Sequence, residues 1–237
     1  MLDKQLKKLE RKFGKFAVNK LMLYIVAGMF MLFVGEMVAE SMPNVQGSIY
    51  SFLNFDRELI LRGQVWRLIS FIFLPPIDVR PRFMIFELYF CWLFGNSLEE
   101  HWGSFRFNVY YLLGTLGAII SGFITGGASN HFLNMSLLIA FAMIYPDHEI
   151  LLFFFLPIKM KWIAAADAVF MIWTLIMGAP GTKLLIVFSF VNLLLFFGGD
   201  MYVNVRYFFR KKFGKGGSGR GRKKEKRAKN IDISKRR

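Results

Sequence analysis

A serine paired with a histidine base could attack a carbonyl, and this chain has three histidines, His101, His131 and His148. A serine hydroxyl is a poor nucleophile at its free pKa and needs a base within hydrogen-bond reach. His131 lies two residues after Ser129, but a histidine so placed is more often a loop residue than a catalytic partner. Spacing to a histidine therefore identifies no activated serine.

Cys91 is the only cysteine, and it lies within an apolar run. One cysteine can form neither a disulfide nor a multi-thiolate metal site within the chain. We interpret it as a small buried hydrophobic residue, and we expect neither a metal nor another cofactor.

A third set of candidates consists of polar side chains inside apolar segments: Glu87, Asn134, Ser136, Asp167, Ser189 and Asn192. Such groups are costly in lipid and therefore tend to face the interior of a helix bundle. Glu87 and Asp167 could belong to a proton or ion path. Hydrogen bonds between helices are the simpler interpretation and the one we prefer.

The composition indicates that these residues are positioned by membrane helices. Hydrophobic residues make up 55% of the 237 residues and aromatic residues 17%. The 28 phenylalanines lie in runs that a soluble core of this size could not bury completely. The sequence therefore predicts an all-α integral membrane protein.

Six apolar segments, several of them separated by prolines, predict six membrane-spanning helices. They are Leu21 to Val38, Phe83 to Leu98, Phe107 to Thr125, Phe132 to Tyr145, Trp162 to Met177, and Leu184 to Gly199. The fourth is short for a lipid-facing span, which suggests a helix buried among its neighbours. The long connection from Glu40 to Arg82 is expected to contain half-inserted helices.

Residues 1–20, 21–205 and 206–237 form three predicted regions: a basic amphipathic segment, the membrane domain, and a basic tail. The first has apolar residues at helical spacing between lysines, which indicates a helix on a membrane surface, or alternatively a solvated leader. Six spans and two basic ends place both termini in the cytoplasm by the positive-inside rule. This leaves five arginines outside, in need of partners or an interfacial position: Arg57, Arg62, Arg67, Arg80 and Arg82.

The tail holds 15 lysines and arginines against Glu225 and Asp232, so it accounts for nearly all of the net charge of +15. Its glycine-rich, polar sequence predicts disorder. Anionic phospholipid and RNA are the expected partners, and a topology anchor without a partner is the alternative. The contact residues would be Arg220, Arg222, Lys223, Lys224, Lys226 and Arg227.

Two motifs resemble the rhomboid superfamily of six-helix membrane proteins. Trp66-Arg67 follows the first span, as in the membrane-embedded first loop of that family. Gly95 and Glu99 match the Gly-x-x-x-Glu element that closes its second helix, followed by Gly103-Ser104. The resemblance covers roughly residues 20 to 200. It suggests Glu99 as the partner of Arg67; contact of Arg67 with lipid headgroups is the alternative.

The chain departs from rhomboid proteases at every catalytic position. Asn130 replaces the second glycine of their Gly-x-Ser-Gly motif, and Ser136 also lacks a following glycine. The sixth span holds no histidine, and Phe83 and Glu87 stand where the family has its oxyanion-binding residues. A carboxylate there would repel an oxyanion. The resemblance therefore implies a pseudoprotease, with no catalytic residue unless Ser129 or Ser136 acts by another route.

Inactive rhomboid relatives bind transmembrane segments of client proteins. We therefore expect a non-catalytic protein that binds the lipid bilayer and other transmembrane proteins, in quality control, insertion or assembly. A divergent intramembrane serine protease and a small ion or proton-coupled transporter are the alternatives. The basic flanks favour a bacterial plasma membrane.

Overall fold

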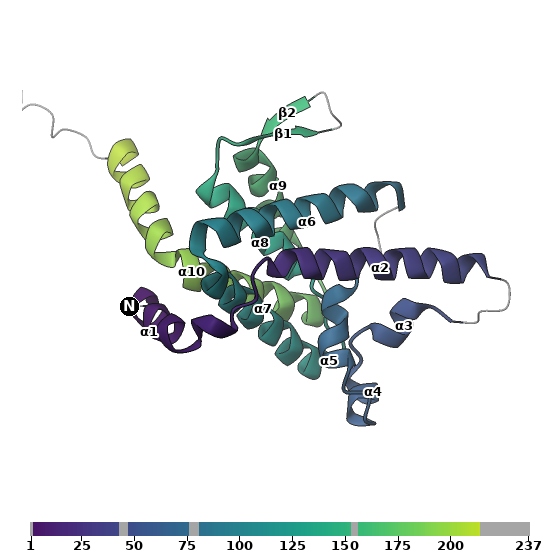
Figure 1. The fold of residues 1–237 in the computed structure, drawn as a ribbon. Coiled ribbons are helices and arrows are strands. Elements are labelled where there is room, and N and C mark those ends of the chain that lie inside the picture. Colours follow the sequence, from purple (N-terminus) through teal and green to yellow (C-terminus); the bar gives the residue numbers. More distant parts are fainter. Residues whose placement is uncertain (1, 43–46, 76–80, 153–155, 214–237) are drawn as a thin grey trace, which may run out of the picture. The chain divides into compact units, whose positions relative to one another are not determined.

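The fold is described from a computed structural model, which covers residues 2–42, 47–75, 81–152 and 156–213. The chain divides into two units, Met1–Phe196 and Phe197–Arg237. The first contains most of the helices and a short β-hairpin, and the described part of the second is the end of one helix. The protein is thus mostly helical, as its composition predicts (Figure 1).

The N-terminal segment is helical, as the spacing of its apolar residues predicts. α1 (Leu2–Phe13) is followed by a 3₁₀ turn, η1 (Gly14–Phe16), and then by α2 (Leu21–Ser41). Leu6 is buried, whereas Phe13 and Phe16 are exposed. A lysine ammonium lies over each of these two rings, at 5.3 Å from the centroid for Lys12 and 5.2 Å for Lys15. That the exposed face meets a membrane surface stays a prediction.

The connection after α2 folds into short helices: α3 (Ile49–Leu53), α4 (Arg57–Leu61), α5 (Arg67–Ser70) and the 3₁₀ turn η2 (Phe71–Phe73). Local caps explain where two of them begin. The Ser48 hydroxyl accepts the N–H of Tyr50, and the Asp56 carboxylate accepts that of Leu59. Short helices in this connection are therefore confirmed, and insertion of the segment into a bilayer stays a prediction.

Helices are present at all six predicted spans. Besides α2 these are α6 (Pro81–Trp102), α7 (Ser104–Thr125), α8 (His131–Ile144), α9 (Met160–Met177) and α10 (Pro180–Phe213). In the described part of the chain, four segments are long and apolar enough to cross a membrane: α2, α7, α9, and Pro180–Phe197 of α10. α8 has 14 residues, fewer than the roughly 20 that a span needs.

Two features differ from the predicted arrangement. A β-hairpin joins α8 to α9, in which β1 (Glu149–Leu152) pairs antiparallel with β2 (Leu156–Lys159). A short apolar run cannot be assigned to helix or strand by periodicity, so the sequence did not reveal it. α10 continues to Phe213, so the expectation of a disordered segment from Arg206 onward is wrong for its first part.

Lysines secure the base of this hairpin. Lys161 donates to Asp147 at 2.8 Å, and Lys159 lies 3.8 Å from the same carboxylate. The hydrogen bond from Lys161, together with the charges of both lysines, lowers the pKa of Asp147 below its usual range. Asp147 is fully exposed to solvent, so we attach no stability to this pair.

Glycines let the helices approach closely. α2 and α6 lie side by side (Figure 1), and a Cβ at Gly95 would overlap the buried side chain of Met22. On α7, a Cβ at Gly114 would overlap Leu133 of α8. A Cβ at Gly117 would lie 2.9 Å from the Phe188 side chain, and a Cβ at Gly122 would lie 2.5 Å from the Phe55 ring. Small residues on α7 thus allow close contact with neighbouring elements.

Replacing Gly95 with alanine should therefore destabilise the protein by about 1–3 kcal/mol, because Met22 is fully buried and must move. Gly35→Ala is the matched control on α2, because its Cβ would meet Ile49 at an ordinary 3.4 Å. The measurement is dodecyl sulfate titration of each variant in mixed micelles. Equal midpoints for the two alanine variants would contradict this account of the α2–α6 contact.

Candidate functional site

Ser136 lies in the core between α7 and α8, where it is 1% exposed. Its hydroxyl donates to the Leu133 carbonyl at 2.6 Å, one turn earlier in α8. It also shares a 2.6 Å hydrogen bond with the Tyr110 hydroxyl, which is left to act as the donor. Both hydrogen bonds hold Ser136 in a structural role, because neither partner is a base that could remove its proton.

Ser129 occupies the loop before α8 and is exposed. Its hydroxyl accepts the backbone N–H of His131 at 3.1 Å. In the described ranges of the chain, neither Ser129 nor Ser136 has a hydrogen bond to an imidazole ring. The His131 side chain instead lines a cavity against α6. The geometry therefore does not bring a serine and a base together.

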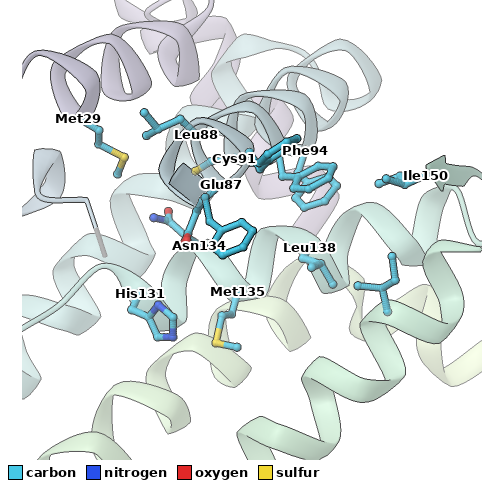
Figure 2. A pocket seen from close by; sticks show the side chains of 14 residues that line it. Met29, Glu87, Leu88, Cys91, Phe94, His131, Asn134, Met135, Leu138 and Ile150 are labelled. Carbon is cyan, nitrogen blue, oxygen red and sulfur yellow. The ribbon is translucent and has the colours of Figure 1, made fainter. Parts of the chain in front are cut away.

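The cavity has a volume of about 350 Å³ and lies between α6 and α8, with Met29 of α2, Ile150 of β1 and Ile163 of α9 completing its wall (Figure 2). Its lining is largely apolar. The α6 residues are Phe83, Phe86, Glu87, Leu88, Phe90, Cys91 and Phe94, and the α8 residues are His131, Asn134, Met135 and Leu138. Cys91 is buried in this wall, as its sequence context predicts.

Two hydrogen-bond acceptors in the cavity lack a partner among the residues that the structure describes. Glu87, which is half-buried, has neither a hydrogen bond nor an ion pair there. The Oδ1 atom of Asn134 is buried and also accepts no hydrogen bond. Figure 2 shows both side chains at the cavity, with His131 below them. The two polar residues thus come from different helices to one site.

The expected pairing of Arg67 with Glu99 is wrong. Arg67 is 3% exposed, and all its described hydrogen bonds stay within the α2–α6 connection. Its Nη1 atom lies 2.9 Å from the Ser51 carbonyl and 2.7 Å from both the carbonyl and Oδ1 of Asn54, and its Nε donates to Gln64. Carbonyl oxygens freed at the end of α3 thus replace the carboxylate that the motif suggested.

Trp66 packs on the same corner of the connection. Its ring stacks on Phe52 with centroids 5.3 Å apart, and its indole N–H points to the Phe52 carbonyl at 3.4 Å. The Arg67 guanidinium lies 5.8 Å from the centre of the same Phe52 ring. The Trp-Arg pair therefore stabilises the fold of the connection itself.

Glu99 caps the start of α2. Its carboxylate accepts the backbone N–H groups of Lys20 at 2.6 Å and Leu21 at 3.1 Å, and the Ser104 hydroxyl at 2.7 Å. A negative charge is favourable at a helix N-terminus, where backbone N–H groups lack partners. Gly103 makes the turn that brings Ser104 back, with φ of +85°, which a side chain would strain. The Gly-x-x-x-Glu element thus joins the first three apolar helices.

The remaining polar residues of the apolar helices differ in their partners. Asn192 donates to the Tyr110 carbonyl at 3.0 Å, which is the kind of bond between helices that we expected. Ser189 donates to Leu185 within its own helix at 2.9 Å. Asp167 is 8% exposed on α9 and its Oδ2 has no described partner. Asp167 is not part of the cavity wall, so it does not share the site of Glu87.

Two residues that position the site were missed by the sequence analysis. Asn130 is 4% exposed, and its side-chain amide donates to the carbonyls of Ile72 at 2.6 Å and Leu74 at 3.3 Å. Its position directly before an apolar helix was the feature of the sequence that could have indicated a structural role. Glu36 is 7% exposed and accepts the N–H of Ile49 at 2.7 Å. An acidic residue inside an apolar span was the signal there.

Glu36 also affects its neighbour at the start of α3. Burial, together with the negative charges of Glu36 and Glu40, raises the pKa of Tyr50 to about 12. Tyr50 therefore stays neutral well above physiological pH.

Other predicted sites fall outside the part of the chain that the structure describes. Arg220, Arg222, Lys223, Lys224, Lys226 and Arg227 all lie beyond Phe213, so their contact with phospholipid or RNA stays a prediction. Among the described residues, no group of three or more histidine, cysteine, aspartate or glutamate side chains is arranged to hold a metal ion.

Arg67→Ala should lower the free energy of unfolding by at least about 2 kcal/mol, because it leaves buried carbonyl groups without donors. Arg62→Ala is the matched control in the same connection. Its side chain is 74% exposed and its Nη2 atom lies 3.9 Å from the Glu58 carboxylate, so its loss should cost under about 0.5 kcal/mol. Dodecyl sulfate titration measures both variants, and similar losses would refute the special role of Arg67.

Comparison with known proteins gives no relative from which a function could be inferred. No protein-family model matches this chain, and no curated protein matches it. The functional conclusion therefore depends on the cavity and on the hydrogen bonds around it.

Proposed function

We propose that this protein is a non-catalytic, rhomboid-like membrane protein that binds transmembrane segments of other membrane proteins, in quality control, insertion or assembly. In this proposal all six apolar helices cross the membrane, both termini are cytoplasmic, and the membrane is a bacterial plasma membrane. The observation that carries the proposal is the cavity between α6 and α8, which is walled by apolar side chains.

The rim of the cavity suits a ligand that arrives from the lipid. Phe83 and Phe86 are 43% and 39% exposed on α6, at the edge of the cavity. Apolar side chains on a helix that lies in a membrane face lipid or another apolar segment. A volume of about 350 Å³ is at the low end for a ligand pocket, so it would take side chains of a client helix lying alongside.

The side chains in the wall can adapt to different ligands. Met29 and Met135 line the cavity together with several phenylalanines. Methionine has an unbranched, polarisable side chain that repacks around ligands of different shape, and it is common on surfaces that bind many partners. A wall of this kind favours recognition of a class of hydrophobic segments over recognition of one small molecule.

The positions of the serines support a role without catalysis. Ser136 is held by Tyr110 and Leu133, and Ser129 accepts the backbone N–H of His131. Neither arrangement supplies the base that an attacking serine requires. Binding of a client needs none of these groups.

A serine-directed fluorophosphonate tests the protease alternative. We expect labelling of the purified protein to be at background level and to be unchanged by Ser129→Ala or Ser136→Ala, because neither hydroxyl is activated. An active intramembrane serine protease in the same detergent is the positive control. Labelling that disappears with either substitution would overturn the non-catalytic assignment.

Site-specific photocrosslinking tests client binding. p-Benzoylphenylalanine replaces Phe86 at the rim of the cavity, or, as matched control, Phe170, which is 51% exposed on α9 and outside the cavity wall. Both variants are placed in liposomes with tagged single-span peptides that have leucine, glutamine, lysine or glutamate at the centre. We expect the set of peptides to crosslink more strongly at position 86, and equal yields would contradict client binding at the cavity.

A further inference from the structure

We propose that the cavity between α6 and α8 selects transmembrane segments that carry a basic side chain, because Glu87 and Asn134 offer it two acceptors that lack partners in the described structure. This inference rests on the proposed function of client binding. It adds the chemical feature by which one client would be preferred over another.

The first step concerns Glu87. It lies on α6 among Phe83, Phe86 and Phe90, which line the same cavity. Neither a hydrogen bond nor an ion pair to its carboxyl group is present in the part of the chain described. A carboxyl group in apolar surroundings is retained at a cost to stability, and such residues inside membrane segments generally serve a function. Glu87 has the position and the charge to attract a cation from a ligand.

The second acceptor comes from a different helix. Asn134 lies on α8, and its buried Oδ1 accepts no hydrogen bond. Buried polar atoms nearly always have partners, so an unpaired acceptor in a cavity wall indicates where a donor from outside would fit. The titratable groups that line the cavity with it are Glu87, Cys91 and His131.

Position distinguishes these two acceptors from other unpaired polar atoms of the described structure. Buried side-chain atoms without a partner also occur at Asn108, Tyr111, Thr115, Ser121, Asp167 and Asn192, and none of those residues lines the cavity. By contrast, Glu87 and the Oδ1 of Asn134 face a cavity that has room for a ligand group. A donor from a ligand could therefore reach both of them.

The occupant follows from this chemistry. An entirely apolar segment would fill the cavity and leave both acceptors unpaired. A lysine side chain has an apolar stem that can pass the phenylalanine rim, and its ammonium group donates up to three hydrogen bonds. A glutamate at the same place would instead meet Glu87 as a like charge and be rejected. Lysine should therefore be preferred to leucine, and leucine to glutamate.

The peptide set with the photocrosslinker at position 86 measures this preference directly. A charge-assisted hydrogen bond should give the lysine peptide about tenfold more crosslinked product than the leucine peptide at limiting concentration. The glutamine peptide should fall between them. Glu87→Gln should abolish most of the lysine preference, whereas Asp167→Asn, the matched change of a buried carboxyl group outside the cavity wall, should leave it intact.

Asn134→Leu provides an independent variant, because it removes the second acceptor without changing the charge of the cavity. It should also reduce the preference for lysine, and size-exclusion profiles confirm that each variant is folded. Equal yields from the lysine and leucine peptides, or a preference that survives both substitutions, would overturn the selectivity. If no peptide crosslinks at position 86 above the level at position 170, the proposed function fails as well.

Discussion

The hydrogen bonds of the buried Arg67 guanidinium are the interaction on which the arrangement of the site depends. They satisfy carbonyl groups of Ser51 and Asn54 where α3 ends, so that an irregular segment can pack against apolar helices. The connection then packs the rings of Phe55 and Phe71 together in the core beside α7, with centroids 5.7 Å apart. It also supplies the carbonyls of Ile72 and Leu74 that Asn130 binds.

Asn130 links the connection to α8, the helix that forms one wall of the cavity. It immediately precedes α8, so its hydrogen bonds to the connection fix the start of the helix that carries His131 and Asn134. On the other side, Glu99 holds the start of α2 to the end of α6, and Gly95 allows Met22 to pack against α6. The helices meet closely at these points. The rings of Phe94 on α6 and Phe141 on α8 also pack together, with centroids 5.0 Å apart. Phe94 is also part of the cavity wall.

Much of the helical arrangement could be predicted from the sequence, because apolar segments of membrane-spanning length are a local property. Helices are present at each of the six segments, and Cys91 is buried. The hairpin of β1 and β2 was not predicted, because a short apolar run fits a strand as well as a helix. The helical segment before Phe213 was missed because its basic composition resembles that of a disordered tail.

The helical class, the approximate helix positions and the identity of the polar residues inside apolar segments all follow from the local sequence. Which of these polar residues meet depends on the tertiary structure. Glu99 and Arg67 are both in recognisable motifs, yet each binds backbone groups of a different segment. Glu87 and Asn134 share one cavity, from which Asp167 is absent. The reason is that a side chain's partner depends on how helices distant in sequence cross, and that crossing is set by many packing contacts together.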